Sequence, residues 1–319
     1  MNKILAIMPI SIGGRLTTSS FIDGFVQNGF EVIVYDELKN DNFLDYLSDD
    51  FEYIIGYDFS PIKLKKDYKL NIPLIAYFSD DINLKTAGVD YDKLKNEIYK
   101  KDNHIFYWDR TLAKKEKLPY LPHFVNLEIY KNFLKPEKDV LFMGRLDTQL
   151  RLETFINLNK MLPDLSFSWY AIEKHYLDAL NRAKFKDKKI IEKCYFGFID
   201  NEKDMAKIIN KHKIVYNINA QGESSLNYRT IQTLACKRLI ISDYRKELDI
   251  FNNLVPIYHN IDDLKEKIEY YLKNEKEYNV IVDGCYEIVK KNHSSVAAVK
   301  KILDSINQNP WYCFLQECF

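Results

Sequence analysis

Short apolar runs alternate with longer amphipathic segments along almost the whole chain. Runs that are apolar on both faces are typical of parallel strands, because helices then cover both sides of the sheet. Crossovers between parallel strands are right-handed, so repeated strand–helix units build a doubly wound α/β domain. The runs expected to form strands lie near residues 3–9, 31–35, 52–56, 73–78, 104–108, 139–143, 166–171, 194–197, 214–218 and 238–241.

The alternation pauses near residue 120, which divides the chain. The segment LPYLPHFVNLEIYKNFLKPEKD carries three prolines and no sustained period, as expected of a linker. A chain of 319 residues also exceeds the usual size of a single core. We therefore predict two Rossmann-like domains, over residues 1–122 and 123–319, that face each other across a cleft. The last helix, about 294–308, can pack back on the first domain.

The balance between basic and acidic residues argues against a nucleic-acid partner. Forty-six lysines and arginines match 46 aspartates and glutamates, whereas a nucleic-acid-binding protein needs a basic surplus. The five cysteines form no CxxC pair, no metal-ligand spacing is visible, and no apolar stretch approaches the ~18 residues of a membrane span. The sequence thus predicts a cytoplasmic protein without metal, cofactor, transmembrane segment or nucleic-acid partner.

The stretch KIVYNINAQGESSLNYRTIQTLACKRLIISD is the most specific candidate site. It places Ser224, Ser225, Asn227 and Arg229 between the end of a strand and the start of a helix. A helix N-terminus attracts anions through its unpaired N–H groups and its dipole. A serine there caps the helix under any interpretation. Arg229, however, adds a positive charge to an already positive helix end, which favours a bound phosphate or another acidic partner.

A second candidate lies in FMGRLDTQLR, where Gly144 and Arg145 follow the first strand of the second domain. Arg151 comes six residues later, at the start of the next helix. Two converging arginines suit a diphosphate, because guanidinium groups bind phosphate oxygens in bidentate fashion. The alternative for Arg151 is a solvated helix residue.

Two loops of the first domain are also candidates. In PISIGGRL, Gly13 and Gly14 let the backbone approach a ligand and Arg15 could meet an anion, although a tight turn explains the glycines as well. In IAYFSDDINL, Asp80 and Asp81 follow a strand, so one of them could act as a general base or hold a sugar hydroxyl. Paired aspartates also begin turns and helices routinely.

The stretch SLNYRTIQTLACKRLIISDYRKELDIF is similar to the CgeB-type family of glycosyltransferases. Members of that family carry Ser-Leu-Asn-x-Arg-Thr, a helix ending in Ala-Cys-Gly, a short strand and an acidic turn. DVLFMGRLDTQLRLETF resembles the strand and first helix of the same domain, and YLPHFVNLEIY resembles the segment between the two domains of such enzymes. The resemblance covers roughly residues 120–290 and implies the GT-B fold.

The resemblance also implies a function and a set of contacts. A nucleotide-sugar donor would lie in the second domain and the acceptor in the first, and no metal would be needed. The implied donor contacts are Arg145, Ser225, Asn227 and Arg229, with Thr230 in the same motif. Gln232 stands where family members carry a glutamate that holds the donor ribose, and Lys237 replaces the glycine of Ala-Cys-Gly.

The leading expectation is therefore a bacterial, cytoplasmic glycosyltransferase that transfers a hexosyl-type sugar to a glycan or protein acceptor. Two alternatives stay open, namely a nucleotide-sugar epimerase and a non-catalytic nucleotide-binding protein of the same fold. The apolar ending NPWYCFLQECF could pack on the first domain, join a partner to form an oligomer, or touch a membrane surface.

Overall fold

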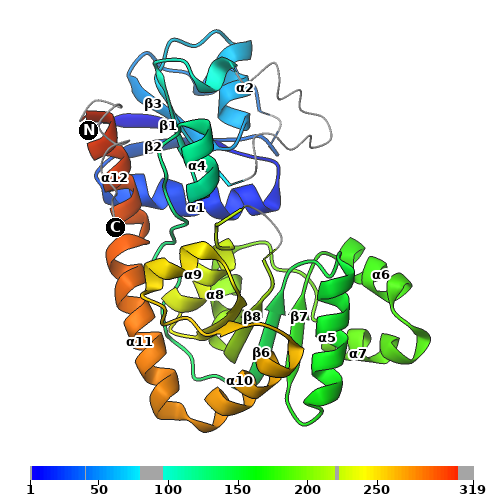
Figure 1. Cartoon of the computed structure of the whole chain (residues 1–319). Helices are drawn as coiled ribbons and strands as arrows, with labels where there is room; N and C mark the ends of the chain where they lie inside the picture. Colours follow the sequence, from blue (N-terminus) through cyan, green and yellow to red (C-terminus); the bar gives the residue numbers. More distant parts are fainter. Residues whose placement is uncertain (1, 40, 80–95, 220–222, 308–319) are drawn as a thin grey trace. The chain divides into compact units, whose positions relative to one another are not determined.

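The computed structural model describes residues 2–39, 41–79, 96–219 and 223–307. Asp80, Asp81 and the aromatic ending NPWYCFLQECF lie outside these residues. The chain divides into two compact units (Figure 1). Unit 1 consists of Met1–Asn126, Gln221–Leu226 and Lys291–Phe319, and unit 2 of Leu127–Ala220 and Asn227–Lys290.

Unit 1 is built on a five-stranded parallel sheet with the order β2-β1-β3-β4-β5. Its strands are β1 (Lys3–Met8), β2 (Glu31–Asp36), β3 (Phe51–Tyr57), β4 (Leu74–Phe78) and β5 (Asn103–Tyr107). The residues of β4 are buried throughout, as expected of a strand covered on both faces. The strands expected in the first half of the chain are thus all present.

The helices of unit 1 include a segment from the far end of the sequence. They are α1 (Ile12–Gln27), α2 (Ser60–Asp67), α4 (Arg110–Glu116) and α12 (Ser295–Asn307). Helix α12 packs against α1, and Ala298, Val299 and Ile302 join the core of this unit (Figure 1). At Gly24 of α1, a Cβ atom would lie 2.7 Å from the carbonyl oxygen of Ser295, so only glycine permits this close approach.

Unit 2 contains a second five-stranded parallel sheet, with the order β10-β9-β8-β6-β7. Its strands are β6 (Lys138–Met143), β7 (Phe167–Tyr170), β8 (His212–Asn217), β9 (Leu239–Asp243) and β10 (Ile257–Tyr258). The prediction of a strand near 194–197 is wrong, because residue 194 ends a helix and Tyr195 forms only an isolated bridge with Trp169. Strand order reverses between β6 and β8, and ligands of open α/β sheets bind beyond the carboxyl ends of strands at such a point.

Helices cover the sheet of unit 2 along most of its length. They are α5 (Gln149–Met161), α6 (Glu173–Arg182), α7 (Lys188–Cys194), α8 (Glu202–Asn210), α9 (Tyr228–Ala235) and α10 (Ile261–Lys273). Helix α11 (Glu275–Asn292) then carries the chain back into unit 1. Two doubly wound parallel-sheet units confirm the predicted α/β class. None of the helices in the described residues is long and apolar enough to cross a membrane.

Candidate functional site

Gly144 lies directly after β6, at the point where strand order reverses. Its φ angle of +130° belongs to a region that favours glycine. Its N–H group donates to the carbonyl oxygen of Tyr170 (3.0 Å), and its own carbonyl accepts from the indole N–H of Trp169 (2.8 Å). A Cβ atom here would lie 2.9 Å from Nη2 of Arg229. The backbone and the arginine therefore both require glycine at this position.

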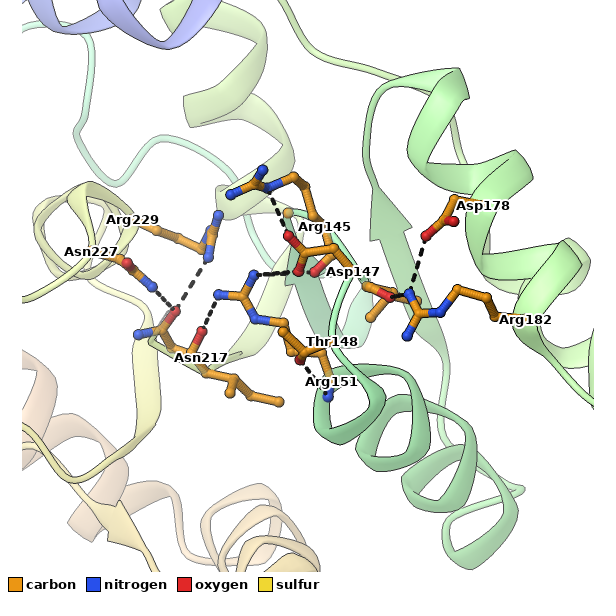
Figure 2. A network of polar contacts seen from close by, with 12 residues as sticks. Arg145, Asp147, Thr148, Arg151, Asp178, Arg182, Asn217, Asn227 and Arg229 are labelled. Carbon is orange, nitrogen blue, oxygen red and sulfur yellow. Dashed lines mark hydrogen bonds and ion pairs between the residues drawn. The ribbon is translucent and has the colours of Figure 1, made fainter. Parts of the chain in front are cut away.

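Arg229, in the first turn of α9, is a cation without a matching anion in the described chain. Its Nη1 donates to the amide Oδ1 of Asn217 (3.2 Å), and it forms no ion pair with any described carboxylate (Figure 2). Burial, and secondarily the positive charge of Arg151, lower the pKa of Arg229 to about 9. The guanidinium is partly buried, so a bound anion would stabilise its charged form.

The N-terminus of α9 adds to this positive potential. Asn227 occupies the capping position, but its side chain makes no capping hydrogen bond and its Nδ2 donates instead to Asn217 Oδ1 (2.8 Å). No acidic residue lies in the first turn. The expectation that Ser224 or Ser225 caps this helix is wrong, because the helix begins at Tyr228. An uncapped helix start beside an arginine has the chemistry of an anion site.

Ser224 and Ser225 instead enclose a carboxylate of the chain itself, within unit 1. The backbone N–H groups of Glu223, Ser224 and Ser225 donate to Oδ2 of Asp109 at 2.8, 2.9 and 3.0 Å. Asp109 Oδ1 accepts from the hydroxyl of Ser224 (3.0 Å) and from the N–H of Leu112 (2.9 Å). The N–H groups expected to hold a phosphate thus already have an anionic partner.

This set of bonds fixes the ionisation state of Asp109. Burial alone would raise the pKa of the carboxyl, but the hydrogen bonds from Leu112, Ser224 and Ser225 outweigh it and hold the pKa below its ordinary value. Successive N–H groups converging on one oxygen form an anion-binding concavity. The carboxylate of Asp109 fills that concavity at neutral pH.

The two arginines of the FMGRLDTQLR stretch have different environments. Arg151 is only 7% exposed, so its interpretation as a solvated helix residue is wrong. Its guanidinium donates to the carbonyls of Arg145 (3.3 Å) and Ile218 (2.6 Å), and to Asp147 (3.2 Å). It thereby ties the loop after β6 to the end of β8. The Arg145 side chain is half-exposed and pairs through Nε with Asp147 (3.2 Å), as Figure 2 shows.

Thr230 and Gln232 lie on the buried side of α9. The amide of Gln232, 3% exposed, donates to the hydroxyl of Tyr130 (2.6 Å). This bond holds the proline-rich segment of residues 118–139 against the helix. Thr230 is fully buried, and its N–H donates to the carbonyl of Asn227 (2.9 Å). Both side chains therefore contribute to the packing of unit 2.

The glycine candidates of unit 1 lie in a helix. Gly13 and Gly14 are in the first turn of α1, and Ser11 caps it by accepting from the N–H of Gly14 (3.3 Å). A Cβ atom at Gly14 would lie 2.6 Å from Ser11 Oγ, so the glycine permits a tight helix start. Arg15 has a bidentate partner in Asp36 (2.7 and 2.8 Å), whose pKa it lowers to about 2.

Sequence reasoning missed an asparagine network beneath Arg229. In the motif YNIN, Asn217 is the last residue of β8 and Asn219 follows it two residues later. Asn219 accepts from the N–H of Asn227 (3.2 Å) and donates through Nδ2 to Asp243 at the end of β9 (2.7 Å). The sequence signal for this network is the pair Asn217 and Asn219, two amide side chains that follow an apolar run at the end of the strand beside the switch point.

Comparisons with known proteins agree with this architecture. Residues 158–304 match the model of a family described as "Glycosyl transferase-like". No curated protein sequence matches the chain. Within the described residues, no group of three or more His, Cys, Asp or Glu side chains is arranged to hold a metal ion.

Several solved structures share the fold. Sucrose-phosphate synthase from Thermosynechococcus elongatus is 11% identical with a TM-score of 0.70, covering 97% of this chain and 99% of that one. HepE from Anabaena, in complex with UDP-glucose, is 10% identical with a TM-score of 0.69, covering 97% and 100%. An alpha-glucosyltransferase in complex with UDP and a 13-mer DNA is 14% identical with a TM-score of 0.69, covering 96% and 99%. The chain therefore has the two-domain α/β fold of GT-B proteins.

Proposed function

We propose that the protein is a glycosyltransferase that uses a nucleotide-sugar donor held by unit 2. The observation that carries this proposal is Arg229, a partly buried cation that forms no ion pair with a described carboxylate and lies at the uncapped start of α9. Gly144, which has no Cβ atom, lets this guanidinium lie directly against the end of β6. A diphosphate matches this site in both charge and hydrogen-bonding capacity.

The role of each group in glycosyl transfer depends on where negative charge develops during the reaction. The bond between the anomeric carbon and the diphosphate oxygen breaks, and an acceptor hydroxyl supplies the new oxygen. The acceptor's proton passes to a base, for which Asp80 or Asp81 remains our candidate. Negative charge builds on the departing diphosphate, so Arg229 and the α9 N-terminus bind the transition state more strongly than the ground state. Arg145, half-exposed in the loop after β6, is a second cation that can bind the phosphates.

These cations can replace a metal ion, so we propose a metal-independent reaction. Support for the donor class comes from the family match and from the UDP and UDP-glucose complexes of the structural neighbours. One neighbour was solved with DNA. The equal numbers of basic and acidic residues in this chain favour a glycan or protein acceptor over a nucleic acid.

Ligand-induced thermal stabilisation tests the donor class directly. UDP-, GDP-, dTDP- and CMP-sugars would be added to the intact protein with EDTA present throughout. One of the three diphosphate donors should raise the Tm by mass action, whereas the CMP-sugars, which carry a single phosphate, serve as a comparison. Failure of all three diphosphate donors to stabilise the protein would contradict the proposal, and stabilisation that requires added Mg²⁺ or Mn²⁺ would contradict metal independence.

Arg229→Ala then tests the residue that carries the proposal. Loss of one preorganised contact to the leaving group should reduce transfer by roughly 10²–10³-fold. The Tm should stay equal or rise slightly, because Arg229 opposes both its helix dipole and Arg151. Lys160→Ala is the matched control, since Lys160 loses the same charge but is ion-paired with Asp187 (2.6 Å). An Arg229→Ala protein that melts early yet transfers sugar at the normal rate would refute the assignment.

A non-catalytic nucleotide-binding protein is the second candidate, and Gln232 favours it. Its amide is committed to Tyr130, whereas the resemblance implies a carboxylate that holds the donor ribose at this position. Such a protein would bind the stabilising nucleotide sugar in the same panel. It would then release no nucleoside diphosphate in the presence of water or sugar acceptors, which distinguishes the two functions.

A further inference from the structure

The guanidinium of Arg229 donates to the side chain of a buried asparagine, Asn217. We propose that Asn217 is a positioning residue that orients the Arg229 guanidinium through a neutral amide, so that the full positive charge remains for the donor diphosphate. This inference rests on the proposed function, because it concerns the same anion site.

The hydrogen bonds of Asn217 determine which way its amide points. Arg229 can only donate hydrogen bonds, so the amide atom that faces it must be the oxygen. That Oδ1 accepts from Arg229 Nη1 (3.2 Å) and from Asn227 Nδ2 (2.8 Å), while Nδ2 donates to Ser242 Oγ (3.3 Å). The residue is completely buried. The side chain of Asn217 therefore orients both the Arg229 guanidinium and Asn227, the capping residue of α9 (Figure 2).

The neutrality of this partner distinguishes Arg229 from Arg15. The carboxylate of Asp36 pairs with Arg15 in bidentate fashion, and such a pair has little charge left for another anion. In the asparagine network, the carboxylate of Asp243 is separated from the Asn227 backbone by Asn219. The network thus fixes the polar groups around Arg229 without placing an anion against its guanidinium.

Two substitutions at one position separate orientation from neutrality. Asn217→Asp keeps the size and the acceptor oxygen but adds a charge beside Arg229. Asn217→Ser stays neutral but loses most of the side chain and its bonds. A purely structural role predicts that the isosteric Asp variant keeps both stability and ligand affinity better than Ser. Our inference predicts that the Asp variant is the more stable of the two but binds the ligand more weakly.

The experiment measures Tm and the Kd for UDP, GDP and dTDP in EDTA, using the intact protein. We expect Asn217→Asp to melt above Asn217→Ser, yet to bind the preferred nucleoside diphosphate about tenfold or more weakly than wild type and more weakly than Ser. Its Kd should also depend less on NaCl concentration, because the site has lost net charge. Asn132→Asp is the matched control, since Asn132 accepts from Arg238 (3.1 Å) and should leave the Kd unchanged.

The possible results distinguish the proposed function from the positioning role of Asn217. A wild-type protein that binds none of the three nucleotides would overturn the proposed function and this inference together. Binding by the wild type with an Asp variant of equal affinity would overturn the inference alone. If Asn217→Asp fails to fold, the Ser variant provides the test. An Asn217→Ser protein whose affinity falls by more than tenfold would then overturn the inference alone, because a neutral replacement should retain most of the binding.

Discussion

At the scale of single residues, the arginines of this chain differ in what holds their guanidinium groups. Arg15 meets a carboxylate, while Arg151 and Arg238 donate mainly to backbone carbonyls. Arg229 meets a single side-chain amide. Guanidinium groups that are saturated by carbonyls or carboxylates contribute to the fold, because their hydrogen bonds and charge are already used. The chemistry available to a ligand is therefore concentrated at Arg229 and, through its exposed side chain, at Arg145.

Gly144→Ala should damage both the backbone and the anion site. A φ of +130° strains any L-residue by about 1–3 kcal/mol, and the new Cβ would displace Nη2 of Arg229. We expect a lower Tm together with at least about tenfold weaker binding of the preferred nucleoside diphosphate. Gly29→Ala is the control, because Gly29 also has a positive φ (+89°) but nothing within 4 Å of its Cβ position. Equal nucleotide affinities in the two variants would contradict this role of Gly144.

At the scale of elements, the polar loop 223–225 is held by a residue more than a hundred positions earlier in the chain. Asp109 caps α4 and also binds the loop, so it joins two elements of unit 1 through one carboxylate. Such charge-assisted hydrogen bonds are stronger than neutral ones and leave several donors unsatisfied when they are lost.

Asp109→Asn should therefore destabilise unit 1 although it changes few atoms. The amide can still cap α4, but its NH₂ group cannot accept from the three N–H groups of the loop. We expect the free energy of unfolding, measured with urea, to fall by about 2–3 kcal/mol. Asp164→Asn, at an exposed position, should change it by less than about 0.5 kcal/mol. An Asp109 variant as stable as this control would show that the loop does not depend on the charge.

The contact between Asp109 and the loop 223–225 also explains which features could be predicted from the sequence and which could not. Strand positions followed from runs buried on both faces, a local property, and nine of the ten strands were predicted in this way. The strand expected near 194–197 is absent, and β10 was missed because it is only two residues long. The helix start near Ser224 was misplaced because a distant carboxylate, and not the helix, uses the serine and its N–H groups. The role of Arg151 was missed for the same reason, since its partner Ile218 is far away in sequence. Long-range polar pairing leaves no periodic signal in a chain.

At the scale of the whole molecule, buried histidines link the stability of unit 1 to pH. His123 is joined to Tyr77 through Nδ1 (2.9 Å), and Nδ1 of His293 donates to the carbonyl of His123 (2.8 Å). Burial, with a smaller effect of His293, lowers the pKa of His123 to about 3, and burial lowers that of His293 to about 4. Both imidazoles are thus neutral in the folded protein and become charged on unfolding at mildly acidic pH.

The protein should lose stability as the pH falls below about 6.5, the ordinary pKa of histidine. Between that value and the folded pKa, the unfolded state binds more protons, so each histidine lowers the free energy of unfolding by up to about 1.4 kcal/mol per pH unit. Urea unfolding at pH 7, 6 and 5 measures this slope. His293→Gln should have a shallower slope than wild type, whereas His259→Gln, at an exposed position, should keep the wild-type slope. Identical slopes in all three proteins would contradict the assignment.

The return of α12 to unit 1 has a consequence for how the protein is made. Ala298, Val299 and Ile302 complete a core whose other members belong to the first 124 residues, and Gly24 accepts the backbone of Ser295 directly. On the ribosome, the sheet of unit 1 emerges first but must wait for its last helix until unit 2 has been synthesised. Unit 2 can reach its native packing during that delay. A gene fragment that encodes only the first half would therefore yield a unit 1 with an incomplete core, because α12 is encoded at the opposite end of the gene.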